Sequence, residues 1–179
     1  VNMSLNYPAN YPAAVIEEAR DLIAAAVQAV GHRWGAFHCE CIVADSGVYL
    51  VEIGGRPGGG HLFAHIFEQE RGLDAPVVLA GLLLRRDIDP SPLKVGGACY
   101  RFLSAPAGRF IAAEGLAKAG KLPGVDTIGL TIRPGETGGT VTHDNARHGW
   151  VVTGGRDRDE ALQRAGDALN AIRLKMTRD

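Results

Sequence analysis

The sequence lacks an excess of charge of either sign, a long apolar run and enough cysteines for a disulfide framework. Its 179 residues carry 19 Lys and Arg against 20 Asp and Glu, so we expect neither a nucleic-acid partner nor an anionic-membrane partner. No apolar run approaches the ~18 residues that a membrane-spanning helix needs. Cys39, Cys41 and Cys99 are few and odd in number, which favours a reducing, cytoplasmic setting.

Apolar side chains are plentiful, at 46%, and 22% of the residues are charged. This composition is typical of a folded chain rather than a disordered one. Glycine is abundant, with 24 residues, and the chain begins with Val1. From the missing initiator Met we expect a piece cut from a longer protein.

Hydrophobic periodicity and turn residues predict a mixed α+β chain. Residues 1–12 are expected to form a loop, because prolines interrupt them. Helices are expected at residues 13–30, 61–71, 74–84 and 157–176. Strands are expected at residues 35–44, 48–53, 95–103, 109–114, 127–132 and 150–153. Residues 87–92 have the composition of a linker, so we expect two domains, residues 1–90 and residues 91–179.

The first two strands predict a hairpin with a charged face. A three-residue loop at 45–47, closed by a left-handed glycine, would set Ala44 opposite Val48. Counting back in steps of two, Glu40 then faces Glu52 on the same side of the hairpin. Two like charges in such a pair are destabilising, and a hard divalent cation such as Mg²⁺ between them is the simplest resolution. Two solvated acids are the alternative, and a two-residue turn would place them on opposite faces.

A glycine-rich loop follows the second strand and precedes an expected helix. It contains Arg56 and the run Gly58, Gly59 and Gly60. Backbone N–H groups in such a loop, with a helix N-terminus behind them, provide a place for an anion. The guanidinium of Arg56 suits a carboxylate or phosphate, so one site could hold a metal ion on Glu52 and an anion beside it. A tight strand-to-helix connection is the alternative, and the loop is not a Walker A motif.

Other histidines and cysteines carry weaker signals. His61 and His65 lie one helical turn apart, but no third metal ligand is evident, and His61 could instead assist anion binding at the start of the helix. The H-x-E pattern that begins at His38 lacks the Pro-Cys-x-x-Cys partner of zinc deaminases. Cys39 and Cys41 would point away from the glutamates, as core thiols.

The runs from Gly35 to Glu40 and from Tyr49 to Gly60 resemble the metal-binding hairpin of the ATP-grasp carboxylate–amine ligases. Residues 121–125, 133–136, 147–151 and 157–161 are similar to the small C-terminal domain of amino-acid-ligase and biotin-carboxylase-like members of that superfamily. The resemblance covers nearly the whole chain. It implies an α+β fold. The first part would be the C-terminal part of an ATP-grasp fold, which is an antiparallel sheet with helices, and a small strand-rich domain would follow it.

The resemblance also implies roles for individual residues. Glu40 and Glu52 match the acids that hold two Mg²⁺ ions, or Mn²⁺, on ATP. Ile42 matches the apolar residue that lies against the adenine. Arg56 matches the arginine that contacts the acyl-phosphate or the substrate carboxylate. One departure is Gly54, which stands where an Asn often supplies a third metal-facing group.

The resemblance implies that a small-molecule carboxylate and an amine are joined through an acyl-phosphate. The N-terminal half of the family pattern, with the ATP clamp and the substrate domain, is absent here, so we expect the fragment alone to be inactive. The alternative function is a ligase-derived module for association or regulation. A third possibility is a subunit whose active site is completed by a separate polypeptide. The exposed surface of a half-protein would also favour a homodimer.

Overall fold

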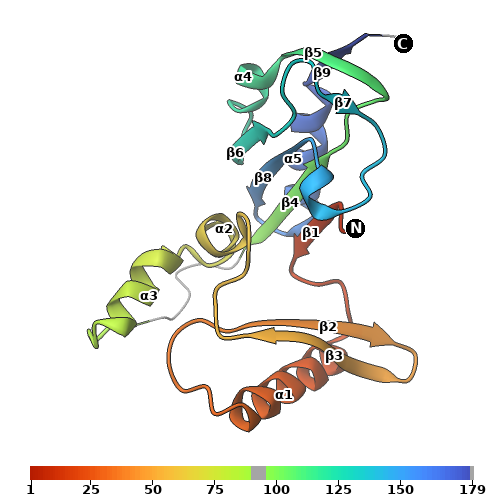
Figure 1. Cartoon of the computed structure of the whole chain (residues 1–179). Coiled ribbons are helices and arrows are strands. Elements are labelled where there is room, and N and C mark those ends of the chain that lie inside the picture. Colours follow the sequence, from red (N-terminus) through yellow and green to blue (C-terminus); the bar gives the residue numbers. More distant parts are fainter. Residues whose placement is uncertain (90–95, 178–179) are drawn as a thin grey trace.

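The structure is a computed structural model that describes residues 1–89 and 96–177 (Figure 1). A long hairpin backed by one helix lies at one end, and a group of strands around a second long helix lies at the other. A segment of short helices connects these two parts along one side. No helix in these two stretches is long and apolar enough to cross a bilayer.

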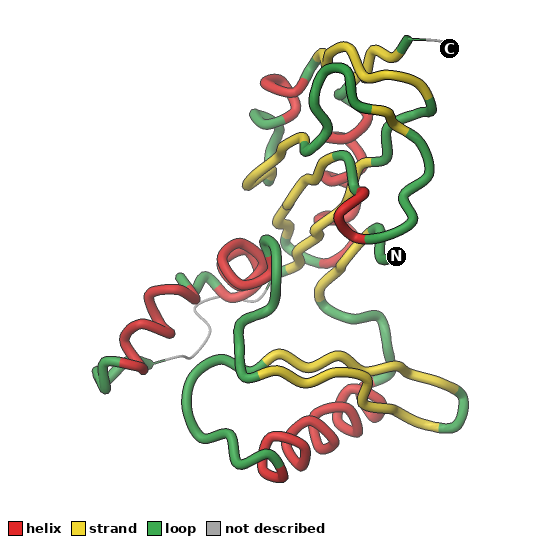
Figure 2. The backbone as a smooth tube through the Cα atoms, in the orientation of Figure 1, coloured by secondary structure: helices red, strands yellow, loops and turns green. Residues whose placement is uncertain are grey.

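The first part is a two-stranded hairpin with a helix along one face (Figure 2). Strands β2 (His38–Ala44) and β3 (Gly47–Gly54) are antiparallel, and α1 (Ala13–Ala29) packs against them. The helix begins directly after Pro12, and Gly31, at φ 68°, turns the chain away from its end. The helix expected at residues 13–30 is therefore confirmed.

Three short helical segments follow the glycine-rich loop. The first, η1 (Leu62–Ile66), is a π-helix that runs directly into α2 (Phe67–Arg71), and α3 (Ala75–Leu83) comes next. Gly72, at φ 68°, ends α2, and the side chain of Asp74 caps α3 by accepting a hydrogen bond from the Val77 N–H at 3.0 Å. The two helices expected here are confirmed, although the first opens in π geometry rather than α geometry.

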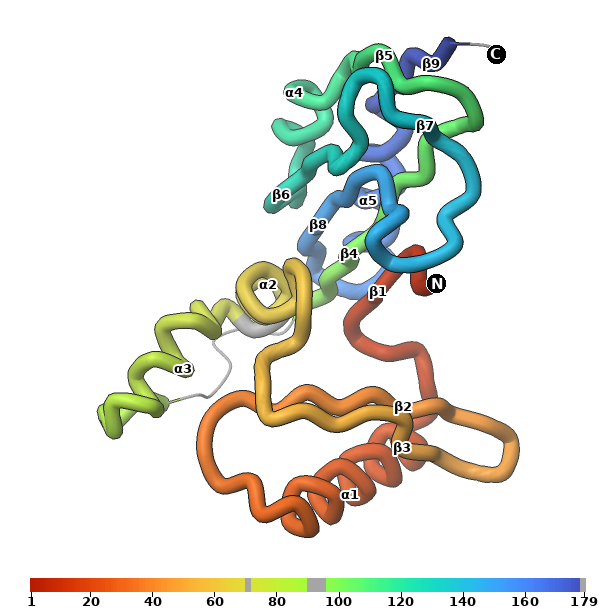
Figure 3. Tube along the Cα trace, in the orientation of Figure 1, coloured from red at the N-terminus to blue at the C-terminus, as the bar shows by residue number. Residues whose placement is uncertain are grey.

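The second part is centred on a four-stranded antiparallel sheet with the strand order β1-β4-β8-β6. Its strands are β1 (Ser4–Tyr7), β4 (Gly97–Leu103), β6 (Val125–Leu130) and β8 (Gly149–Gly155). Figure 3 shows the N-terminal strand β1 beside β4, which comes from the middle of the sequence. Strand pairing therefore joins the first residues to the second part, and the division at residue 90 stays a prediction.

The two faces of this sheet are covered by different elements. Cys99 and Val151 point to α5 (Arg158–Asn170), which buries a stripe of alanines against them. Tyr100 and Val152 point the other way and pack with Ile66 of η1. Because side chains alternate along the strands, one face of the sheet packs on α5 and the other packs on the segment that follows the glycine-rich loop.

The remaining elements form a second small sheet with the strand order β7-β5-β9. Its strands are β5 (Gly108–Glu114), β7 (Thr137–Gly138) and β9 (Arg173–Met176). Two short helical turns, α4 (Leu116–Ala119) and η2 (Asp144–Ala146), lie in the connections. Ala105, Phe110 and Ile132 form the core of this region.

Several expectations need correction. Residues 1–12 are not all loop, because residues 4–7 form β1 against β4. The last helix ends at Asn170 rather than near Met176, because residues 173–176 pair with β5 instead. The expected linker at 87–92 lies partly outside the described residues. The α+β fold class is confirmed.

The start of α5 supplies a test of helix capping. The Asp157 side chain accepts a hydrogen bond from the Glu160 N–H at 2.9 Å. We expect Asp157→Ala to lower the free energy of unfolding by about 1 kcal/mol in urea unfolding. Asp159→Ala is the matched control, because Asp159 shares the first turn but its side chain is 93% exposed. Equal losses in the two variants would assign the effect to the helix dipole rather than to the cap.

Candidate active site

The hairpin sets Glu40 opposite Glu52, but not through the expected turn. The loop has two residues rather than three, because Ala44 pairs with Gly47. This pairing continues to Cys41, and there a β-bulge in β3 shifts the register by one residue. The extra residue is Val51, because Leu50 pairs with Cys41 while Glu52 pairs with Glu40. Without the bulge, the two glutamates would lie on opposite faces.

The two-residue loop also changes the partner of the other expected site residue on β2. Ile42 pairs with Tyr49 rather than with Leu50. Ile42 still lies on the side of Glu40, two residues along the same strand, and is 57% exposed. Tyr49 and Val51 are 51% and 55% exposed. The hairpin face that carries the glutamates is therefore an open surface with apolar side chains around the two acids.

The opposite face of the hairpin packs on α1. Cys39 and Cys41 alternate with the exposed Glu40 and are half-buried on that side, as expected. Burial, followed by the neighbouring Cys41 thiol, raises the pKa of Cys39 to about 11. This thiol is therefore protonated at neutral pH and is a poor nucleophile or metal ligand.

Each glutamate has one basic neighbour. Nε2 of His38 lies 3.3 Å from a carboxylate oxygen of Glu40. The guanidinium of Arg56 donates to Glu52 at 3.2 Å and to the Pro57 carbonyl at 2.9 Å. The side chains of Glu40, Glu52 and Arg56 are all about half exposed, at 55%, 54% and 52%. All three can reorient toward a ligand at little cost in buried contacts.

The glycine-rich loop leads from this face to the second part of the molecule. A Cβ on Gly58 would meet the His38 ring at 3.3 Å, so the loop passes close to the start of β2. Gly60 has φ 60°, and a Cβ there would meet the Tyr100 hydroxyl at 3.1 Å. The loop is thus held at one end by the hairpin and at the other by β4. Anion binding by Gly58, Gly59 and Gly60 stays a prediction.

His61 lies at the end of the loop, but its ring packs onto the second part. It stacks on Trp150, with ring centroids 5.0 Å apart, and meets Tyr100 edge-on at 5.4 Å. His65, one turn later, reaches Asp126 of β6, with Nδ1 and Oδ2 2.5 Å apart. Sequence inspection missed Asp126, since it lies 61 residues from His65 and no local pattern connects the two.

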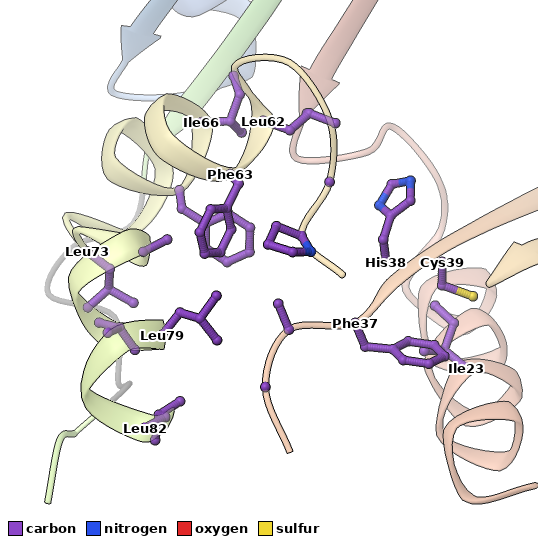
Figure 4. A pocket seen from close by; sticks show the side chains of 17 residues that line it. Ile23, Phe37, His38, Cys39, Leu62, Phe63, Ile66, Leu73, Leu79 and Leu82 are labelled. Atoms are coloured by element: carbon purple, nitrogen blue, oxygen red, sulfur yellow. The ribbon is translucent and has the colours of Figure 1, made fainter. Parts of the chain in front are cut away.

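An apolar pocket of ≈ 580 Å³ lies beside the loop, and Figure 4 shows the side chains that line it. Its walls come from α1, the start of β2, the loop, η1 and α3, and include Phe37, His38, Phe63 and Leu79. At the C-terminal end of α3, Leu83 and Leu84 are 60% and 71% exposed. Together with the open hairpin face, these surfaces leave much apolar area uncovered.

No group of three His, Cys, Asp or Glu side chains that could hold a metal ion occurs within residues 1–89 and 96–177. The pair Glu40 and Glu52 nevertheless fits Mg²⁺, which is commonly held by one or two carboxylates and takes its other ligands from phosphate and water. Gly54 adds no ligand. The oxygen donors and the absence of nearby thiolates on that face are consistent with a hard cation.

The fold has close counterparts among solved structures. The L-amino acid ligase of Bacillus licheniformis superposes with a TM-score of 0.82 at 17% identity, over 99% of this chain and 45% of that one. The phosphoribosylglycinamide synthetase of Anaerococcus prevotii gives 0.80 at 15%, over 98% and 45%. The chain has the fold of the C-terminal part of an ATP-grasp ligase. The expected resemblance is thereby confirmed.

Further comparisons agree with this likeness in fold. Residues 101–177 match the family model of the L-amino acid ligase C-terminal domain 2. A biotin carboxylase domain dimer of the Hydrogenobacter thermophilus 2-oxoglutarate carboxylase, in complex with MgADP and bicarbonate, gives a TM-score of 0.66 at 15% identity, over 98% of this chain and 40% of that one. No curated protein matches the sequence. The chain spans less than half the length of these ATP-grasp structures.

Proposed function

We propose that this chain carries the metal-binding half of the active site of an ATP- and Mg²⁺-dependent ligase that joins a carboxylate to an amine. The observation that carries the proposal is the cross-strand pair of Glu40 and Glu52 on an open hairpin face, with Arg56 bonded to Glu52. Similar folds in amino acid ligase and carboxylase structures support it. The exposed hairpin and α3 surfaces would then be covered by the other half of the ligase.

Each residue of the hairpin has a role in the proposed reaction. Glu40 and Glu52 would hold Mg²⁺, which neutralises phosphate charge while the γ-phosphoryl group moves to the substrate carboxylate. Ile42 provides an apolar surface for the adenine. Arg56 is half exposed and can leave Glu52 for the acyl-phosphate, where its planar guanidinium fits two oxygens at once.

The reaction is mainly one of positioning and charge neutralisation. The substrate carboxylate attacks the γ-phosphate of ATP, the bond to the β–γ bridging oxygen breaks, and an acyl-phosphate and ADP result; the amine then displaces phosphate from the acyl carbon. Arg56 and the N–H groups of Gly58–Gly60 would offset negative charge on the acyl-phosphate. We propose two Mg²⁺ ions, with Mn²⁺ as a substitute, because a bound triphosphate offers more oxygens than one ion with two glutamates can engage.

The test is ADP formation by the protein expressed from its natural start, together with any polypeptide that co-purifies. We expect ADP release that requires Mg²⁺, a carboxylate and an amine, and that stops when EDTA removes the metal. The 179-residue chain alone should bind ATP weakly, because its hairpin face is open on one side. The proposed ligase function is refuted if no amino acid or other small acid, tested with an amine, stimulates ADP release. The association or regulatory module is then the remaining function.

A further inference from the structure

The proposed ligation needs a proton acceptor, which the proposed metal-binding glutamates and Arg56 do not supply. An amine substrate is largely protonated at neutral pH, and only its unprotonated form can attack an acyl carbon. Glu40 and Glu52 are assigned to the metal, and a guanidinium such as that of Arg56 offers only hydrogen-bond donors. The base must therefore come from elsewhere. This inference rests on the proposed function.

A histidine–aspartate pair stands where the glycine-rich loop meets the second part. His65 lies in the last turn of η1, and Asp126 lies on β6. Nδ1 and Oδ2 are 2.5 Å apart, and the two side chains are 32% and 22% exposed. The pair is thus sheltered enough to hold its geometry and open enough for a small molecule to reach it.

The carboxylate of Asp126 decides which ring nitrogen of His65 can take a proton. An ionised carboxylate only accepts hydrogen bonds, so Nδ1 carries the hydrogen and donates it. In the neutral ring, Nε2 is then left with a free lone pair. When Nε2 gains a proton, the adjacent carboxylate stabilises the imidazolium that forms, as the aspartate does in a catalytic triad.

His61 has the opposite environment. Burial, followed by the charge of nearby His65, lowers its pKa, and the charge of Asp126 offsets this only in part. Its ring is enclosed by Trp150, Tyr100 and His65, the last with ring centroids 4.9 Å apart. This environment disfavours the charged form of His61, and its ring packs against the ring of His65. The neighbouring α3 has no ionisable side chain.

The other four histidines are poorer candidates. His38 contacts Glu40, which is assigned to the metal. Nδ1 of His148 accepts the Ala105 N–H at 2.9 Å and lies in a separate recess of the second part. His32 packs on Phe37 behind the hairpin, and His143 lies on the exposed segment before η2.

We propose that His65, oriented by Asp126, is the catalytic base that accepts the proton of the amine substrate. One ammonium proton passes to Nε2, and the freed nitrogen lone pair forms the new C–N bond with the acyl carbon. The C–O bond to phosphate breaks, and its electron pair leaves with the phosphate. The amine nitrogen loses a second proton to that phosphate, and the proton on His65 returns to solvent.

The test compares two nucleophiles in the protein expressed from its natural start. An amino acid needs a base, whereas hydroxylamine is already unprotonated at neutral pH and traps the acyl-phosphate as a hydroxamate. We expect His65→Gln to lower amino-acid ligation about 100-fold while hydroxamate formation is kept. Asp126→Asn should lower amino-acid ligation by a smaller factor, and it should also keep hydroxamate formation. His143→Gln is the control and should leave both rates unchanged.

The pH profile is a second readout, which a merely structural role would not change. In the wild type, amino-acid ligation should fall more steeply than hydroxamate formation as the pH drops, and His65→Gln should remove this difference between the two nucleophiles. If neither variant changes the rate of amino-acid ligation, His65 is not the base. The same holds if a folded variant loses amino-acid ligation and hydroxamate formation equally. In both cases the proposed ligase function is unaffected. If the wild type forms no hydroxamate at all, the proposed function itself has failed. If the Tm of His65→Gln is much lower than that of the wild type, the two nucleophiles are compared in Asp126→Asn instead.

Discussion

Replacing Glu52 by Ala is expected to lower the rate of ATP-dependent ligation by at least ~100-fold, the scale for loss of a principal electrostatic group. Glu52 is the acid that sits opposite Glu40 and also bonds Arg56. Its removal would take away a metal ligand and release the guanidinium from its resting position. The measurement is ADP formation at saturating Mg²⁺ in the protein expressed from its natural start.

A second acid on the same part of the chain provides the control. Glu17 of α1 forms an exposed ion pair with Arg20 at 2.6 Å, and such surface pairs contribute little. Glu17→Ala should therefore leave the rate unchanged. Near-normal turnover of Glu52→Ala would contradict the assignment of this residue to the metal.

The second large effect concerns stability and involves a glycine at the start of β4. Gly97 pairs with Gly155 across β4 and β8, and a Cβ on Gly97 would lie 2.0 Å from the Asp157 carbonyl oxygen. The obstacle is backbone at the N-terminus of α5, which cannot swing away as a side chain could. We expect Gly97→Ala to cost about 3 kcal/mol and to lower Tm by roughly 10 °C.

A glycine within α5 should behave in the opposite way. Gly166 is helical, and the nearest atom to an added Cβ is 3.8 Å away, on the side chain of Arg101. Gly166→Ala should raise the free energy of unfolding by about 1 kcal/mol, because alanine is the better helix former. Thermal unfolding followed by circular dichroism measures both variants. A Gly97→Ala chain as stable as the wild type would show that the N-terminus of α5 can move away from the end of β4.

Local signals explain the elements that the sequence predicts well. α1 lies between Pro12 and Gly31, and α5 begins at the capping residue Asp157, so each boundary is marked by residues next to it. The hairpin was also predictable, because strand alternation and turn residues are local. The pairing of Glu40 with Glu52 was obtained for the wrong reason, since a two-residue turn and the Val51 bulge together replace the expected three-residue loop.

Strands that pair over long sequence distances escaped prediction. Leu5 of β1 lies opposite Tyr100 of β4, and nothing near residue 5 marks it as a strand. The end of the chain was expected to be helical, yet Arg173 pairs with Glu114 of β5. In both cases, the backbone hydrogen bonds of a distant strand decided the conformation of a short segment with weak preferences of its own.

The sequence by itself determined the chemistry that the chain can offer: two acids, an arginine and a glycine-rich loop in an order that resembles one superfamily. Tertiary structure alone decided which groups meet. It placed Val51 as the bulge that turns Glu52 to the face of Glu40, and it brought Asp126 to His65 across 61 residues. Residue type is local information, whereas contacts between distant residues follow from the packing of η1 and the strands into one structure.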